Sequence, residues 1–395
     1  MKYAVVLPDG AADEPVPELD GRTPLEAAHT PNIDWIAVNG RQGRVQTVPD
    51  GFAPGSDVAT LSLMGYDPRT DYFGRAPLEA AAKGITARPG QTLFRCNLVT
   101  IVDGAMADFT AGHIAQPEAD RLIADLNDHF GDQPCRFHAG VSYRNLMVAD
   151  LPDNARIIAT PPHDIPDRPI RGYMPTGPGS EWVRGVMDQA HRMLAEHDVN
   201  LVRRDLGDNP VTDIWLWGHG RPRRLQPFTE RFGVCAAVIA GVDLIRGIAK
   251  TIGMTVLDVP GATGYLDTDY VAKGAAGVAA LDSHDVVIVH VEAPDEAGHL
   301  GDVGAKVEAI ERVDRHVVGP LLSALRDRSA WRILIAPDHP TPVGRRTHTA
   351  DPPPFCLAGT RVHPVLGRPM SESTASRSEL QVDPGFELME YFLRV

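Results

Sequence analysis

Acidic and histidine side chains follow three short apolar runs of this sequence, at the point where each run ends. They are Asp9 in YAVVLPDG, Asp295 and His299 in VVIVHVEAPDEAGH, and Asp338 and His339 in RILIAPDH, with His348 further on in RRTHTADP. The four-residue spacing of Asp295 and His299 places both side chains on one face of a single helical turn. Carboxylates combined with imidazoles are the ligands of Mn²⁺, Zn²⁺, Fe²⁺ and Co²⁺ sites. The three run ends therefore indicate a metal centre.

A purely structural explanation exists for each motif taken alone. Loop carboxylates often cap helices, and histidines often pack partly inside a protein. Three strand ends with the same chemistry favour the metal centre, because ligands of open α/β sheets gather beyond the carboxyl ends of the strands. Pro294 and Gly298 argue against a long helix around Asp295, so we expect a short turn there.

The stretch PGSDVATLSLMGYDP, residues 54–68, supplies a hydroxyl group that could attack phosphorus. Gly55 permits a close approach, and Ser56 opens a predicted helix. Serine before an acidic residue is also a common helix N-cap, and that role would be preferred if the motif stood alone. Beside two metal ions, Ser56 would lose its proton more readily and become a nucleophile. The N-terminus of its helix would then help to hold a phosphoryl group.

The elements that must position these residues are alternating strands and helices. Apolar runs rich in β-branched residues suit strands that are buried on both faces, and helical stretches lie between several of them. The predicted strands lie within 3–10, 214–220, 234–241, 255–261, 286–295 and 332–339, and the predicted helices within 242–253, 270–283 and 303–327. This alternation predicts an α/β fold with a mostly parallel sheet layered by helices.

The middle of the chain has a different pattern. Its predicted strands of a mixed or antiparallel sheet are 93–104, 134–150 and 155–160, and one clear helix covers 116–130. We therefore predict that a smaller α+β domain, 86–205, is inserted into a core formed by 1–85 and 206–395.

Composition restricts the partners of the protein. The 395 residues carry a formal net charge of −14, which argues against nucleic acid, because that binding depends on basic surface. A small anionic substrate is compatible with this charge if its pocket is locally basic. No apolar run approaches the ~20 residues that span a bilayer, and the N-terminal run is too short for a signal peptide. Four scattered cysteines without a C-x-x-C motif indicate free thiols, so we expect a soluble cytoplasmic protein.

A resemblance to the alkaline phosphatase superfamily rests on the ordered set Asp9, Ser56, Asp295, His299, Asp338, His339 and His348. Longer phrases narrow the resemblance and extend over nearly the whole chain. They include LPDGAADEP, PGSDVATLSLMGYDP, GRAPLEAAAKGI, VPGATGYLDT, HVEAPDEAGHLGD and PDHPTPVGRRTHTADPPPF. These phrases are similar to the cofactor-independent phosphoglycerate mutases of the archaeal type, including their bacterial branch.

This resemblance implies a two-metal phosphotransferase that interconverts 3-phosphoglycerate and 2-phosphoglycerate through a phosphoserine, without 2,3-bisphosphoglycerate. The implied nucleophile is Ser56. One implied ion is surrounded by Asp9, Ser56, Asp338 and His339, and the other by Asp295, His299 and His348. Mn²⁺ or Mg²⁺ is the expected ion, with Zn²⁺ and Co²⁺ as alternatives, and the imidazoles favour Mn²⁺ over Mg²⁺.

Binding of the anionic substrate would need fixed cationic groups. The positions that match the family's phrases are Arg95, His113, Arg144 and Arg246. A guanidinium group can bind a carboxylate or a phosphate through two hydrogen bonds, although a lone arginine is more often part of a surface salt bridge.

Two other classes of function remain open. A metal-dependent phosphatase or a homoserine-kinase-like phosphotransferase would share every metal ligand, and its phosphoryl group would end on water or on a different alcohol. A metal-stabilised binding protein with a decayed site would keep its function when Ser56 is replaced by alanine, whereas an enzyme would lose phosphoryl transfer.

Overall fold

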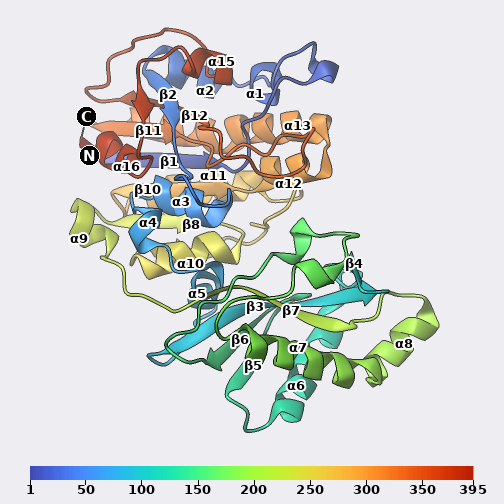
Figure 1. Cartoon of the computed structure of the whole chain (residues 1–395). Helices are drawn as coiled ribbons and strands as arrows, with labels where there is room; N and C mark the ends of the chain where they lie inside the picture. The colour runs from blue at the N-terminus through green and yellow to red at the C-terminus, as the bar shows by residue number, and fades with distance from the viewer. Residues whose placement is uncertain (395) are drawn as a thin grey trace. The chain divides into compact units, whose positions relative to one another are not determined.

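The computed structural model describes residues 1–394, which form two compact units (Figure 1). Unit 1 consists of Met1–Tyr72 together with the chain from Arg224 onward, and unit 2 is the intervening segment Phe73–Arg223. The predicted domain boundaries, 85/86 and 205/206, both fall inside unit 2.

Unit 2 extends beyond the predicted insertion because elements at both of its ends belong to its sheet. The strand β7 (Asp213–Gly220) pairs with β3 (Gln91–Val102), and the helix α5 (Arg75–Ala82) packs on both strands. The Phe73 carbonyl and Gly220 also approach so closely that a Cβ atom at Gly220 would lie 1.6 Å from that oxygen. The two ends of the segment are therefore held together inside one unit.

Unit 1 is built on an eight-stranded sheet in the order β13-β2-β12-β11-β1-β10-β8-β9. The strands are β1 (Lys2–Pro8), β2 (Arg41–Val45), β8 (Ala236–Ile239), β9 (Thr255–Leu257), β10 (Val286–Val291), β11 (Trp331–Ile335), β12 (Pro354–Gly359) and β13 (Gln381–Val382). The strand β1 is parallel to both of its neighbours, so that Val5 lies opposite Ile288 and Leu334. Only β12 runs antiparallel to its neighbours, which confirms the predicted mostly parallel sheet.

Helices pack on this sheet and bury its strands. They are α1 (Pro24–Ala27), α2 (Pro31–Val38), α3 (Ser56–Leu63), α4 (Pro68–Asp71), α9 (Phe228–Phe232), α10 (Asp243–Thr251), α11 (Tyr270–Ala280), α12 (Ala293–Leu300), α13 (Val303–Val313), α14 (Gly319–Arg326), α15 (Glu372–Ala375) and α16 (Glu387–Arg394). A π-helical turn, Asp314–Val318, joins α13 to α14. All six residues of β10 are buried, as its continuous run of apolar residues predicts.

Unit 2 contains a five-stranded antiparallel sheet in which β3 is central. Its strands are β3, β4 (Ala105–Asp108), β5 (Cys135–Val141), β6 (Arg144–Asp150) and β7. Its longer helices, besides α5, are α6 (Gln116–Phe130), α7 (Ser180–Ala195) and α8 (Asp198–Leu206). The helix α6 matches the predicted helix 116–130, and the mixture of sheet and helices matches the predicted α+β character.

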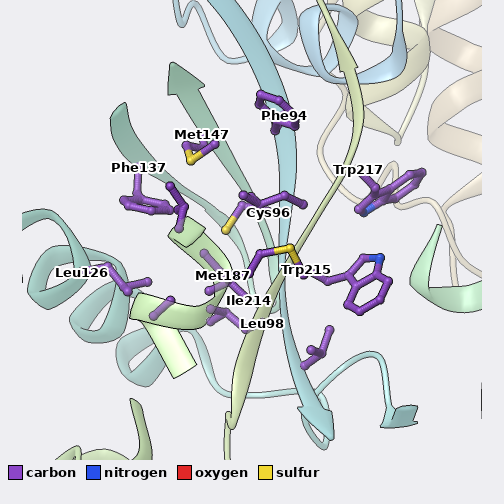
Figure 2. Close-up of a cluster of buried hydrophobic side chains, with 14 of the residues drawn as sticks. Phe94, Cys96, Leu98, Leu126, Phe137, Met147, Met187, Ile214, Trp215 and Trp217 are labelled. Carbon is purple, nitrogen blue, oxygen red and sulfur yellow. The ribbon is translucent and has the colours of Figure 1, made fainter. Parts of the chain in front are cut away.

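One predicted strand belongs to the other sheet, and another does not form. The run 214–220 is predicted for the parallel sheet but forms β7 of unit 2, because Trp215 and Trp217 pack in the core of that unit (Figure 2). The segment 155–160 forms only a bridge between Ile158 and Thr176. Prolines flank this segment on both sides, and a proline cannot donate to a sheet ladder.

Two expectations about the chain as a whole can also be compared with the structure. No helix among residues 1–394 has the length and apolar character that crossing a bilayer requires. All four cysteines are free thiols, as predicted, and three of them are buried.

Candidate metal centre

Three neighbouring parallel strands of unit 1 end at the predicted ligands. The strands β10, β1 and β11 lie side by side with the same chain direction. Asp9 follows β1 directly, and its backbone N–H donates to the Val291 carbonyl at the end of β10, at 3.0 Å. Because parallel strands present their carboxyl ends at one edge of a sheet, the side chains that follow these strands meet there.

The first group at this edge contains Ser56, Asp9, Asp338 and His339, all of which are buried. The His339 Nε2 atom lies 3.6 Å from Asp9 Oδ1 and 3.4 Å from Asp338 Oδ2. It also lies 3.1 Å from the Ser56 Oγ atom. The N-cap of α3 is Gly55, and Ser56 is the first helical residue, so the Ser56 hydroxyl is not used as a helix cap. The group therefore places one nucleophilic hydroxyl among potential metal ligands.

The second group contains Asp295, His299 and His348. Asp295 and His299 lie on α12, an eight-residue helix where a short turn was expected, and Pro294 is tolerated because it stands in the first turn. The Asp295 Oδ2 atom is 3.2 Å from His299 Nε2, and Asp295 Oδ1 is 3.5 Å from His348 Nε2. The two histidine Nε2 atoms are 3.0 Å apart. All three side chains thus face one point.

The two groups are adjacent. The rings of His339 and His348 have centroids 4.2 Å apart, and those of His299 and His348 are 4.7 Å apart. Segments from five parts of the sequence therefore converge within one region of unit 1. The structure brings together every residue that the sequence predicts as a metal ligand.

Negative charges are concentrated at this edge of the sheet. Burial, together with the neighbouring carboxylates Asp338 and Glu292, raises the pKa of Asp9 well above its ordinary value of 3.8. Burial and the nearby Asp295 raise the pKa of Glu292 to about 8. The protein alone therefore does not supply enough positive charge to keep all of these carboxylates ionised.

In the second group, neighbouring histidines favour the ionised form of the carboxylate. Burial opposes the ionisation of Asp295, but His348 and His299 hold its pKa well below 3.8. Burial likewise favours the neutral ring of His299, yet the hydrogen bond to Asp295 raises the pKa of His299 to about 9. Asp295 is accordingly an ionised carboxylate.

These residues fit a pair of divalent cations. Asp9 Oδ1 and Asp338 Oδ2 are buried and have no hydrogen-bond partner among the described residues. A buried carboxylate oxygen without a hydrogen-bond donor is costly, and a cation would provide the missing interaction. In the second group, the facing Nε2 atoms of His299 and His348 would hold one shared cation in their unprotonated forms. A mixture of carboxylate oxygens and imidazole nitrogens is typical of transition-metal sites.

Three polar residues beside the two groups were not predicted. They are His290, Thr341 and Glu292. His290 Nε2 lies within hydrogen-bond distance of Asp9 Oδ2, at 2.8 Å, and burial lowers the pKa of His290 to about 3, so its ring is neutral. A polar residue inside a run of buried valines is the signal in the sequence that could have identified His290.

The predicted anion-binding residues differ in accessibility. In unit 2, His113 and Arg144 are both exposed, and each lies beside the Tyr143 ring. The Arg144 guanidinium carbon is 5.5 Å from the centre of the Tyr143 ring, and the His113 ring is 6.1 Å from it. These two residues therefore form an exposed patch, with at least one cationic group in Arg144, that a small anion can reach.

The other two predicted residues are engaged by acidic partners. Arg95 is only 3% exposed, forms an ion pair with Glu79, and lies over the Trp217 ring. Arg246, in unit 1, forms an ion pair with Asp258. Arg95 is thus held in a buried ion pair, and it lies close enough to Arg144 for the two guanidinium groups to interact electrostatically.

Comparisons with known proteins give a consistent result. The family model described as 2,3-bisphosphoglycerate-independent phosphoglycerate mutase matches residues 37–200. The 2,3-bisphosphoglycerate-independent phosphoglycerate mutase 2 of Methanothermobacter thermautotrophicus is 46% identical over 394 residues, which cover 100% of this chain and 97% of the relative. A probable 2,3-bisphosphoglycerate-independent phosphoglycerate mutase of Geobacter sulfurreducens is 44% identical over 398 residues, with 100% of both chains covered.

Solved structures agree with these relatives. A protein from Pyrococcus horikoshii has a TM-score of 0.82 and 29% identity, with 99% of this chain and 96% of that chain covered. The cofactor-independent phosphoglycerate mutase from Thermoplasma acidophilum has a TM-score of 0.64 and 27% identity, with coverage of 100% and 99%. With identities above 40% along its full length, the chain belongs to the family of 2,3-bisphosphoglycerate-independent phosphoglycerate mutases.

Proposed function

We propose that this protein interconverts 3-phosphoglycerate and 2-phosphoglycerate, with Ser56 as the nucleophile and two divalent cations as cofactors. The observation that carries the proposal is the position of the Ser56 hydroxyl. Its Oγ atom lies 3.1 Å from His339 Nε2, at the N-terminus of α3 and among buried potential metal ligands. Family membership supports the reaction, and this geometry supports the choice of residue.

Two sets of ligands would hold the ions. Asp9, Asp338, His339 and Ser56 would bind one of them, and Asp295, His299 and His348 would bind the other, as their clustering supports. When bound, such cations polarise phosphate oxygens and lower the pKa of a nearby hydroxyl. We propose Mn²⁺ for these sites, because four of the donors are carboxylates or a hydroxyl and three are imidazoles, whereas Mg²⁺ prefers oxygen ligands and water.

Ser56 would act in two steps. Its oxygen attacks the phosphorus of 3-phosphoglycerate, a new O–P bond forms, and the bond from phosphorus to the 3-oxygen breaks. The departing 3-oxygen of glycerate takes a proton. In the second step the 2-hydroxyl of the same glycerate attacks the phosphoserine, loses its proton, and releases Ser56. The net reaction moves the phosphoryl group between two oxygens of one molecule, so no external phosphoryl donor is required.

The remaining negative groups of the substrate need cations from the protein. We assign this role to Arg144 and His113, because both are exposed and lie beside Tyr143. A guanidinium group can accept a carboxylate in a two-point contact, which would fix the orientation of glycerate. Arg95 would support this patch from inside unit 2, through its ion pair with Glu79, and would not contact the substrate itself.

We also place the protein in the cytoplasm, where free thiols such as those of its four cysteines stay reduced. Its partner there would be a small anionic phosphorylated metabolite.

A coupled assay for 2-phosphoglycerate tests the reaction. It should be run from 3-phosphoglycerate without 2,3-bisphosphoglycerate, once with added Mn²⁺ and once with a chelator. We expect activity only in the presence of the metal. Release of inorganic phosphate in proportion to substrate, with no 2-phosphoglycerate formed, would instead identify a phosphatase.

A matched pair of variants tests the nucleophile. Ser62 lies on the same helix as Ser56, is also buried, and its hydroxyl has no hydrogen-bond partner among residues 1–394. We expect Ser56→Ala to lower kcat/KM by at least ~10⁴-fold, whereas Ser62→Ala retains activity. Mass spectrometry of enzyme quenched with substrate should find a phosphoryl group on the peptide that contains residue 56. Full activity of the Ser56→Ala protein would refute the assignment.

A further inference from the structure

Thr341 lies between the two proposed ion sites and contacts a ligand from each. Its Oγ1 atom is 2.5 Å from Asp295 Oδ1, which belongs to the second group. The same Oγ1 atom is 3.2 Å from His339 Nδ1, which belongs to the first group. Thr341 is completely buried, so water does not compete for its hydroxyl.

The direction of these two hydrogen bonds follows from the chemistry of the groups. An ionised carboxylate can only accept, so the single hydroxyl proton of Thr341 is donated to Asp295. The Thr341 oxygen then has only lone pairs left for His339, and the Nδ1 atom of that ring must carry the proton. A neutral imidazole has one N–H, and His339 Nε2 is therefore left with a free lone pair.

That lone pair points to the first group. The Nε2 atom of His339 is the ring nitrogen that lies within 3.6 Å of Asp9 and within 3.4 Å of Asp338. A metal ligand needs an unprotonated nitrogen, and the hydrogen bond on the opposite ring nitrogen selects the tautomer that provides it.

We infer that Thr341 is a positioning residue that fixes the ring tautomer of His339 and the orientation of Asp295, and so prepares both ion sites together. The inference rests on the proposed function, because it assumes that His339 and Asp295 bind cations. It assigns to one hydroxyl a role in both sites, although Thr341 itself contacts no ion or substrate.

The backbone around Thr341 is fixed from several directions. Its carbonyl accepts a hydrogen bond from the buried Lys306 ammonium at 2.8 Å, and its N–H donates to the Ala12 carbonyl at 3.3 Å. Gly298 of α12 packs so closely that a Cβ atom there would lie 2.4 Å from the Thr341 carbonyl oxygen. The hydroxyl is therefore presented from a rigid backbone, as an orienting group requires.

Three variants distinguish the effect of the Thr341 hydroxyl from the effect of the side-chain shape. Thr341→Val keeps the shape and removes the hydrogen bonds, whereas Thr341→Ser keeps the hydroxyl. Thr60→Val is the matched control, because Thr60 is equally buried and its hydroxyl has no partner among residues 1–394. Each full-length, metal-free variant is titrated with Mn²⁺ by calorimetry.

We expect Thr341→Val to weaken Mn²⁺ binding by about 10- to 100-fold, which is the usual effect of removing a partner of a metal ligand. Thr341→Ser should stay within about threefold of the wild type, as should Thr60→Val. Wild-type affinity in Thr341→Val would overturn the inference. Equal losses in Thr341→Ser and Thr341→Val would also overturn it, since the methyl group and not the hydroxyl would then matter.

A measurement on the unmodified chain does not depend on the folding of any variant. Nitrogen-15 NMR of the histidine rings in the metal-free protein reports which ring nitrogen carries the proton. The His339 signals can be identified by their loss in His339→Gln. We expect protonated Nδ1 and unprotonated Nε2, and the opposite tautomer would refute the inference. Failure of the wild type to bind Mn²⁺ would refute the proposed function separately. The observed tautomer of His339 would still show whether Thr341 orients that ring.

Discussion

Lys306 gives the most direct test of how unit 1 supports the candidate site. Its ammonium group is completely buried and donates to Asp13 Oδ2 at 2.6 Å, to the Thr341 carbonyl at 2.8 Å and to the Ala12 carbonyl at 3.2 Å. Lys306→Met preserves most of the side-chain volume and removes the charge. The Asp13 carboxylate, with 1% of its side chain exposed, would remain buried without its cation. Breaking a buried ion pair in this way costs about 3–5 kcal/mol.

Hydrogen exchange followed by mass spectrometry can measure this loss. Peptides from β1 and β10 report the stability of unit 1, and a loss of 3–5 kcal/mol should lower their protection by roughly 10²- to 5 × 10³-fold. Peptides from β3 serve as an internal control, because β3 belongs to the core of unit 2. The double variant Asp13→Asn with Lys306→Met removes both charges and should recover at least ~2 kcal/mol. Unchanged protection in Lys306→Met, or a double variant no more stable than the single one, would refute the reasoning.

Two further predictions concern the same region. Burial raises the pKa of Glu372 from its ordinary 4.5 to about 7, so between these values the folded state binds a proton that the unfolded state does not, and stability falls as the pH rises. Glu372→Gln should remove up to ~3 kcal/mol of this fall. Urea unfolding of the wild type and of the variant at about pH 5 and pH 8 measures the fall in stability. A variant whose stability falls as much as that of the wild type would contradict the idea. Gly10→Ala would place a Cβ atom 2.6 Å from both Asp295 Oδ1 and Thr341 Oγ1, at φ +60°. We expect at least ~10-fold weaker Mn²⁺ binding by calorimetry, whereas Gly51→Ala, at φ +88° in open space, should bind as the wild type does.

The sequence predicts the part of the fold that depends on local pattern and chain direction. The strand 286–291 is a continuous run of buried residues followed by Asp295 and His299, and both features appear in β10 and α12. Chain direction then explains the convergence, since Asp9, Asp295 and Asp338 follow three adjacent parallel strands that end at the same edge of the sheet. Strand ends of a parallel sheet are brought together by topology, so ligands there can be predicted without knowing any side-chain contact.

The sequence could not predict which sheet a strand joins, because that depends on its packing partners. The run 214–220 is equally compatible with a parallel or an antiparallel sheet, because an apolar strand pattern does not specify its neighbour. Trp215 donates through its indole N–H to the Thr160 carbonyl, a contact inside unit 2 that no periodicity encodes. Thr341 was missed for a similar reason, because a threonine in a loop has no pattern until Asp295 and His339 are placed on either side of it.

The arrangement of charges at the strand ends explains why this site suits cations. Asp9, Glu292, Asp295 and Asp338 interact electrostatically while buried, and the pKa of Asp9 is raised by burial and by the other three. Of the nearby lysines, Lys306 is engaged by Asp13, and Lys273, whose pKa burial lowers to about 8, interacts electrostatically with Glu292. A fold that gathers like charges without neutralising them is stabilised by whatever cation binds there, because the ion binds the folded state and has no formed site in the unfolded one. The stability of unit 1 should therefore rise when ions bind. The buried carboxylates that destabilise the metal-free chain are the same groups that would hold the proposed ions beside Ser56.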